Sequence, residues 1–204
     1  MPKKKNINSR FEKIKIFTLG NQEVGKSTFI SRFTEDYFNE SHLKTVGIDN
    51  VTKNITLPNG KTYSVNFWDT AGQEIYKSIS LSTIKKADGI VLMYDITNKK
   101  TFDAIQKWTE DIKDSKGLDF PIILIGNKVD LSDKREVSKE SGEELAKEYG
   151  FKFYETSNKD GTNIKEAGYE LINQIVETKL NQVKDYVIID KKDFEVIKEK
   201  VVCC

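Results

Sequence analysis

The stretch GNQEVGKS, Gly20 to Ser27, is the part of the sequence that decides the fold. Two glycines stand five residues apart, and Lys26 and Ser27 follow the second of them. An alternating apolar run, Glu12 to Gly20, predicts a strand before the stretch, and apolar residues at helical spacing follow it. A strand, the pattern G-x-x-x-x-G-K-[ST] and a helix are, in this order, typical of a phosphate-binding P-loop. Glycines allow backbone N–H groups to surround phosphate oxygens, and the helix N-terminus adds positive potential.

The length and charge of the chain exclude several classes of protein. Its 204 residues suit one α/β domain with a tail, and 33 basic residues against 32 acidic ones leave a net charge of +1. This balance argues against nucleic-acid binding, which normally requires a basic excess or a basic face. No apolar run approaches the roughly 18 residues of a membrane span, and the basic N-terminus lacks the apolar region of a signal peptide. We therefore expect a cytosolic chain with a single core.

Strand and helix patterns alternate along the chain. Continuous apolar runs at Ala87–Ile96 and Pro121–Asn127 predict strands that are buried on both faces, and Asn59-Gly60 predicts a hairpin. Further strands are predicted at 47–57, 61–69 and 151–157, and helices at 100–116, 138–149 and 162–180, with a shorter helix after residue 74. This order predicts an α/β fold of the P-loop NTPase type, with a six-stranded, mostly parallel sheet, one antiparallel edge hairpin and helices on both faces. Ligands bind such sheets at the carboxyl ends of the strands.

The motif DTAGQE, Asp69 to Glu74, ends one of the predicted strands. Asp69 can hold Mg²⁺ through water, the Gly72 N–H can meet a γ-phosphate, and Gln73 can orient an attacking water. If the motif stood alone, a solvated turn would explain it equally well.

Two later motifs point to a guanine base. In NKVD, Asn127 to Asp130, the Asp130 carboxylate can accept hydrogen bonds from both the N1–H and the exocyclic N2 of guanine. Adenine presents an acceptor at N1, so Asp130 selects guanine. The segment ETSNK, Glu155 to Lys159, ends the last predicted strand and is suited to close over the base. The four motifs, in this order, predict a guanine-nucleotide site.

With these motifs the chain resembles the small GTPases of the Ras superfamily, and specifically the Rab family. The resemblance covers residues 13–180 and returns at the C-terminal Cys-Cys; FTEDYFNESHLKTVGID, WDTAGQE and VLMYDIT carry its Rab-like features. It implies a slow GTP-hydrolysing switch in vesicle trafficking that uses GTP, GDP and Mg²⁺. A guanine nucleotide exchange factor would load the switch, a GTPase-activating protein would discharge it, and effectors would bind the GTP form.

The resemblance also implies a role for individual residues. In the family, catalysis would rest on Gln73 and Lys26, and Mg²⁺ would be held by Ser27, by Thr45 when the γ-phosphate is present, and by Asp69 through water. The nucleotide-binding residues would be Gly20, Gln22, Glu23, Val24, Gly25, Lys26, Ser27, Thr28, Phe38, Thr45, Gly72, Asn127, Lys128, Asp130, Ser157, Asn158 and Lys159. Phe38 would pack against the guanine edge, although it could instead anchor a loop in a small apolar cluster. No arginine in these motifs offers itself to the γ-phosphate, so a partner would supply one.

Several positions depart from the family pattern. Gln22 stands where the family often has Gly or Ser; it would either crowd Gln73 and slow hydrolysis or turn to solvent. The sole histidine, His42, is either a solvated loop residue or a group over the phosphates that makes nucleotide closure sensitive to pH. Asn158 replaces the common Ala. On the effector face, three positions that are usually aromatic read Asn50, Trp68 and Thr83, which predicts different partners.

Two segments of the chain, one at each end, lie outside the predicted domain. We expect a flexible basic arm at residues 1–11, a GTPase domain at 12–180 and a hypervariable tail at 181–204. In the Rab family a terminal pair such as Cys203 and Cys204 is doubly geranylgeranylated by a geranylgeranyl transferase after presentation by an escort protein. A GDP-dissociation inhibitor would then maintain a cytosolic pool of a protein that is attached to the cytoplasmic face of an intracellular membrane.

Two functions from different classes fit these observations. The first is a prenylated GTPase switch, which the intact Gln73 favours. The second is a GTP-binding membrane scaffold with negligible hydrolysis, which Gln22 keeps open.

Overall fold

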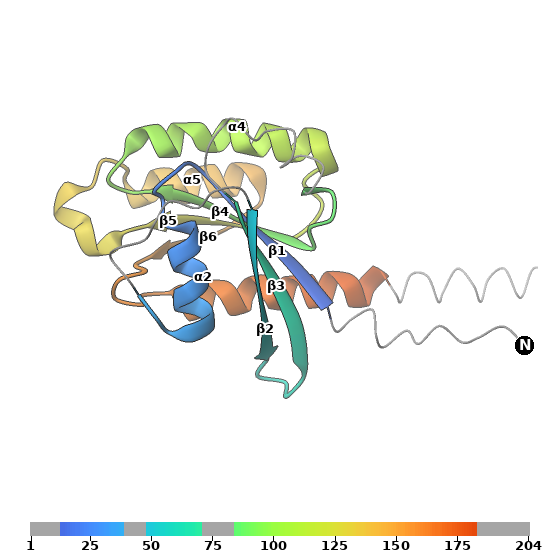
Figure 1. Ribbon diagram of the computed structural model, residues 1–204. Coiled ribbons are helices and arrows are strands. Elements are labelled where there is room, and N and C mark those ends of the chain that lie inside the picture. Colours follow the sequence, from blue (N-terminus) through green and yellow to red (C-terminus); the bar gives the residue numbers. More distant parts are fainter. Residues whose placement is uncertain (1–12, 39–47, 71–83, 183–204) are drawn as a thin grey trace, which may run out of the picture.

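Six strands form one sheet in the order β2-β3-β1-β4-β5-β6 (Figure 1). The computed structural model describes residues 13–38, 48–70 and 84–182. The strands are β1 (Lys13–Leu19), β2 (Ile48–Thr56), β3 (Thr62–Thr70), β4 (Gly89–Asp95), β5 (Ile122–Asn127) and β6 (Lys152–Thr156). All neighbours are parallel except β2 and β3, which pair antiparallel at one edge. The predicted sheet is therefore confirmed, including its antiparallel edge hairpin.

The hairpin turn follows from its residues. The carbonyl of Leu57 accepts a hydrogen bond from Gly60 N at 2.9 Å, and Lys61 N donates to the Asn59 side chain at 2.9 Å. Pro58 supplies the backbone angle that the turn requires at its second position. Gly60 adopts a φ of 77°, which an L-residue rarely takes, and so returns the chain into β3.

Helices cover both faces of the sheet, and each face has its own core. The longer helices of the described residues are α2 (Lys26–Glu35), α4 (Lys99–Lys116), α5 (Lys139–Tyr149), the 3-10 helix η2 (Val129–Lys134) and a C-terminal helix at residues 164–182. In Figure 1, α4 and α5 lie on one side of the sheet, and α2 and the C-terminal helix lie on the other. Every residue of β4 and β5 is buried, because these strands contribute side chains to both cores.

The boundaries of the helices reflect local capping. Asn98 accepts a hydrogen bond from Lys100 N at the start of α4, and Ser138 accepts one from Ser141 N at the start of α5. The observed helix boundaries lie within two residues of the predicted ones, and the C-terminal helix continues to residue 182. The helix η2 was not predicted, and the helix predicted after residue 74 lies outside the described residues. In the described ranges, no helix combines the length and apolar character that crossing a membrane requires.

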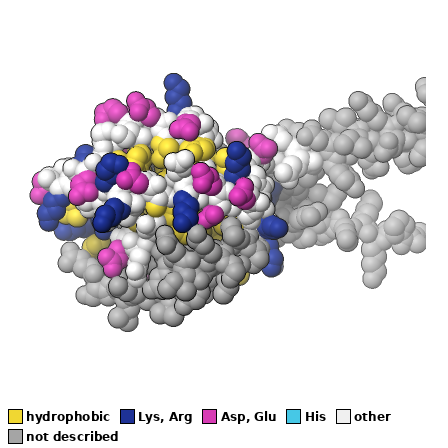
Figure 2. Space-filling model, turned by 90° about the horizontal axis from the view of Figure 1, so that it is seen from above, with side chains coloured by type: hydrophobic (Ala, Val, Ile, Leu, Met, Phe, Trp, Pro, Cys, Tyr) yellow, Lys and Arg dark blue, Asp and Glu magenta, His cyan; other side chains and the backbone are white. Residues whose placement is uncertain are grey.

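The surface over the α4 side carries both signs of charge. Figure 2 shows lysine, arginine and acidic side chains interspersed on this face. Within the helices, Lys99 pairs with Asp103 and Lys139 with Glu143 across one turn. This face is therefore a mixed-charge, solvated surface rather than a field of one sign.

Candidate nucleotide-binding site

The sheet register brings the sequence motifs to one edge. Thr18 in β1 lies opposite Asp69 in β3, and Asn127 in β5 lies opposite both Asp95 in β4 and Thr156 in β6. All these residues are at or next to the carboxyl ends of their strands. The P-loop (residues 20–27), DTAGQE, NKVD and ETSNK therefore start from the same edge of the sheet.

The P-loop backbone adopts conformations that glycine permits. Gly20 has a φ of 136° and Gly25 a φ of 102°, with Glu23 between them at 66°. The Gly25 carbonyl accepts the first helical hydrogen bond of α2, from Phe29 N at 2.8 Å. The N-cap residue Gly25 has no side chain to cap the helix, so this end of α2 suits a phosphate group.

Lys26 is a buried cation at this turn. Only 6% of its surface is exposed, and its Nζ donates to the carbonyls of Gly20 at 3.1 Å and Asn21 at 2.8 Å. Burial lowers the pKa of Lys26 to about 8, although the nearby Asp69 carboxylate partly opposes this shift. The ammonium therefore lacks a strong counter-charge, which phosphate oxygens would supply.

The affinity for GDP should fall about fourfold between pH 7 and pH 8.5. In the free protein Lys26 loses its proton with a pKa of about 8, whereas bound phosphates favour the charged ammonium. Above pH 8, Lys26 must therefore take up a proton when GDP binds, so the affinity for GDP falls as the pH rises. Titration with fluorescent GDP at constant ionic strength measures this effect. The Lys26→Met variant should bind GDP more weakly at every pH, and its affinity should not change between pH 7 and pH 8.5. If its affinity fell by the same factor as that of the wild type, another group would cause the pH dependence.

Ser27 and Asp69 place two oxygen ligands side by side. The Ser27 hydroxyl donates a short hydrogen bond to the Asp69 carboxylate, and Thr18 Oγ1 lies 3.4 Å from the other oxygen of that carboxylate. Hydroxyl and carboxylate oxygens are ligands that Mg²⁺ prefers in phosphate sites. Within the described ranges no three His, Cys, Asp or Glu side chains gather to hold a metal. The pair fits an Mg²⁺ ion whose shell phosphate and water oxygens complete.

Asp130 and Ser157 meet at the proposed base site. The Ser157 hydroxyl donates to Asp130 Oδ1 at 2.8 Å and accepts from Asp160 N at 3.0 Å, which fixes the carboxylate. The preceding Lys128 has a φ of 73° and pairs with Asp95 at 2.6 Å. This pairing holds the start of η2 against the end of β4, so that Asp130 projects from a fixed turn.

The Asn127 side chain connects the P-loop to the loop that follows β6. Its Nδ2 donates to the Val24 carbonyl at 2.8 Å, and its Oδ1 accepts from Thr156 Oγ1 at 3.1 Å and from Asn158 N at 3.3 Å. The side chain is 1% exposed. Asn127 therefore fixes the P-loop against the base loop (residues 157–161).

Three further contacts near the site were also not predicted from the sequence. Trp108 in α4 donates from Nε1 to the side chain of Asn21 at 2.9 Å, and Arg135 pairs with Glu155 through two nitrogens. The third contact runs from the Asn158 side chain to the Gly25 carbonyl at 2.9 Å. The departure at Asn158 was the only signal in the sequence for any of them, because the other two depend on how helices pack.

The remaining predicted residues differ in exposure, and some of them lie outside the described residues. Gln22, Thr28 and Phe38 are half-buried, Val24 is buried, and Glu23 and Lys159 are exposed. Trp68 is half-buried and stacks on Phe17, with ring centroids 5.3 Å apart, and the exposed Asn50 lies opposite it in β2. Outside the described residues lie His42, Thr45, Gly72, Gln73, Thr83, Cys203 and Cys204.

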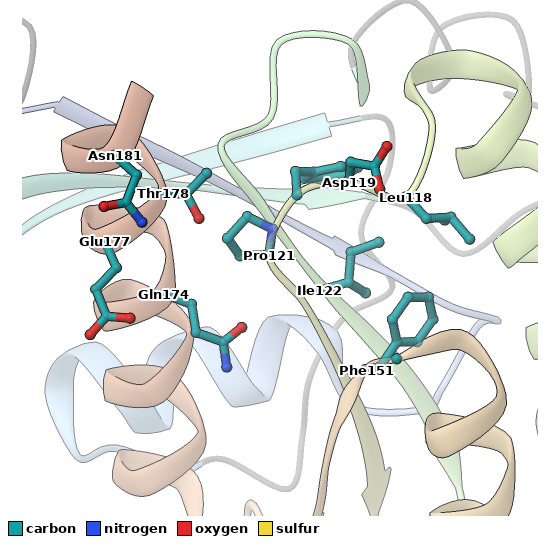
Figure 3. A pocket seen from close by; sticks show the side chains of 11 residues that line it. Leu118, Asp119, Pro121, Ile122, Phe151, Gln174, Glu177, Thr178 and Asn181 are labelled. Carbon is teal, nitrogen blue, oxygen red and sulfur yellow. The ribbon is translucent and has the colours of Figure 1, made fainter. Parts of the chain in front are cut away.

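A shallow cavity lies away from this site. Its volume is about 330 Å³, and its lining comes from the segment before β5, the α5–β6 connection and the C-terminal helix. Figure 3 shows Gln174 and Thr178 extending from that helix toward the segment that holds Pro121. The cavity is at the amino end of β5, and none of the predicted site residues lines it. It is therefore not the nucleotide site.

Known proteins support the same assignment. The Ras family model matches residues 15–177. The chain is 45% identical over 168 residues to Ras-related protein Rab-8B from Homo sapiens, which covers 82% of this chain and 80% of that protein. It is 44% identical over 161 residues to Ras-related protein Rab-8A from Bos taurus, covering 79% of this chain and 77% of that protein. The chain therefore belongs to the Rab family of small GTPases, and it is a GTP-binding, GTP-hydrolysing protein that acts in vesicle trafficking.

Proposed function

We propose that the carboxyl edge of this sheet holds GTP or GDP with Mg²⁺ and hydrolyses GTP slowly as a timed switch. The observation that carries the proposal is that Asn127 Nδ2 reaches the Val24 carbonyl, because this contact brings the guanine-selecting motif against the phosphate-binding loop. A nucleotide that spans the two loops would meet phosphate-binding groups at one end and Asp130 at the other. The alternative scaffold without hydrolysis has no observation in its favour beyond Gln22.

Each end of the nucleotide would have its own residues. The P-loop N–H groups and Lys26 would hold the phosphates, and Ser27 and, through water, Asp69 would hold Mg²⁺. When bound, this ion neutralises charge on the β- and γ-phosphates. Asp130 and Ser157 would face the base, and Phe38 would pack against its edge.

Hydrolysis would use a positioned water. Gln73 orients the water for in-line attack on the γ-phosphorus, the new P–O bond forms, and the bond to the bridging oxygen of GDP breaks. The proton of the water leaves with inorganic phosphate. Lys26 stabilises the charge that develops on the phosphate oxygens. No arginine of the motifs contributes, so we expect slow turnover until a GTPase-activating protein supplies one.

Loss of the γ-phosphate would switch the protein. Thr45 and Gly72 would lose their partners, and effectors that bind the GTP form would dissociate. The exposed Asn50 beside Trp68 supports an effector face with fewer aromatic anchors than is usual in the family. An exchange factor would reload the site.

The segments around the domain would connect the switch to a membrane. We assign residues 12–180 to the GTPase domain, 1–11 to a basic arm and 181–204 to the tail. Prenyl groups on Cys203 and Cys204, added after presentation by an escort protein, would attach the protein to the cytoplasmic face of an intracellular membrane. Two chains anchor stably where one anchors only marginally. A GDP-dissociation inhibitor would extract the GDP form into the cytosol.

Single-turnover hydrolysis tests the proposal. Protein preloaded with GTP and Mg²⁺ should release phosphate slowly but measurably, and Gln73→Leu should lower that rate by about tenfold or more, because the attacking water loses its orienting group. Gln106→Leu, which changes an exposed glutamine of α4, is the matched control and should hydrolyse at the wild-type rate. No turnover in the wild type would instead favour the GTP-holding scaffold.

A further inference from the structure

Asn158 connects the base loop to the P-loop through its side chain. Its Nδ2 donates to the Gly25 carbonyl at 2.9 Å, across 133 residues of sequence. The same carbonyl accepts from Phe29 N at 2.8 Å, so both of its lone pairs are used. Asn158 therefore binds the residue at which the P-loop becomes helix α2.

The surroundings leave this side chain little freedom. Asn158 is 5% exposed, and its backbone N–H donates to Asn127 Oδ1 at 3.3 Å. A Cβ added at Gly25 would lie 2.6 Å from Asn158 Nδ2, so the two loops are in close contact here. The Asn158 Oδ1 atom is buried and finds no hydrogen-bond partner among the described residues. The contact to Gly25 is therefore the hydrogen bond that the described residues offer to this amide.

We propose that Asn158 is a positioning residue that slows nucleotide release by holding the base loop and the P-loop at the spacing of a bound guanine nucleotide. This inference rests on the proposed nucleotide site. The family usually has Ala at this position, which cannot make the contact. The side chain would therefore set a release rate that is particular to this chain.

The physical reason is preorganisation. A nucleotide leaves only when its contacts to the base and to the phosphates are broken, and a change in the spacing of the two loops weakens both sets. Asn127 already connects the loops through Val24, and Asn158 adds a second connection one residue further along the P-loop. A single connection would allow one loop to rotate against the other, whereas two connections restrict this rotation. A site that keeps its bound geometry loses less entropy when it binds, and so it holds its ligand longer.

Release of fluorescent GDP tests the role of Asn158. The full chain is loaded with labelled GDP in the presence of Mg²⁺, and release is followed after addition of excess unlabelled GTP. Asn158→Ala should release GDP about three- to tenfold faster, the range for loss of one buried hydrogen bond. Asn158→Asp, which has the same shape, should release it faster still, because a carboxylate oxygen would face the Gly25 carbonyl. The fraction of protein that binds GDP should stay within about twofold of wild type, since partial unfolding would lower it.

The matched control is Asn163→Gly. Asn163 Nδ2 donates to the Glu155 carbonyl at 2.7 Å, and its φ of 55° suits glycine, so this variant loosens the same region without touching the P-loop. Its release rate should remain within about twofold of wild type. Release from Asn158→Ala at the wild-type rate, or equal acceleration by Asn163→Gly, would overturn the inference. A wild type that binds no labelled GDP would overturn the proposed site itself.

Discussion

Asp130→Asn should lower the affinity for GTP by about 10²–10³-fold and raise the affinity for xanthosine triphosphate. The carboxylate of Asp130 is positioned to accept from two N–H groups of guanine, and an amide turns one of these acceptors into a donor. Xanthine carries a carbonyl in place of the exocyclic amine, so the same amide can accept from N1–H and donate to that carbonyl. Competition between labelled GDP and each triphosphate measures the change.

The Asp130→Asn substitution tests base recognition without removing the hydrogen bond that holds this side chain. The Ser157 hydroxyl donates to Asp130 Oδ1 at 2.8 Å, and an amide oxygen can accept the same bond. Asp133→Asn removes an exposed carboxylate from the same 3-10 helix and serves as the control for charge. It should leave the preference for guanine intact. If Asp130→Asn bound GTP as tightly as the wild type, Asp130 would not face the base.

Gly20→Ala should destabilise the protein by about 3 kcal/mol or more. A Cβ at this position would lie 2.2 Å from the carbonyl oxygen of Met93, a backbone atom of the buried strand β4 that cannot move aside. The φ of 136° adds strain, because L-residues avoid it. Urea unfolding at one saturating GDP concentration measures the loss.

Gly60→Ala separates the two causes of that loss. Gly60 also has a positive φ, 77°, but an added Cβ there meets nothing within 4 Å. This variant should cost only about 1 kcal/mol, the usual strain of a left-handed residue. Equal losses in the two variants would show that strain alone acts at Gly20 and that β4 yields to the new methyl group.

The fold could be predicted because its signals are local. The apolar runs of β4 and β5 have no polar alternation, which matches strands covered on both faces. Asn59-Gly60 marked the hairpin, and Asn98 and Ser138 capped helices close to their predicted starts. The helix η2 escaped prediction because it begins inside the NKVD motif. Its start depends on the left-handed Lys128, which the ion pair with Asp95 holds.

The site could be predicted only in outline. Motif order gave the residues that meet at the sheet edge, such as Ser27 with Asp69 and Asp130 with Ser157. The contacts that hold the loops together, such as Trp108 with Asn21, depend on packing between elements that are distant in sequence. No pattern within a window of sequence contains such information, since it arises from the tertiary structure.

The contacts from Asn127 to Val24 and from Asn158 to Gly25 join residues 103 and 133 positions apart. During synthesis on the ribosome, the P-loop is made before Asn127 and Asn158, the two residues that contact it. Closing such long loops is slow, because ordering the intervening chain precedes any gain from the contact. In a newly made chain, the P-loop therefore lacks both of these contacts until the segments that hold Asn127 and Asn158 have been made and have folded. A ligand that binds only the folded protein would favour this late step, because binding shifts the folding equilibrium toward the state that binds it.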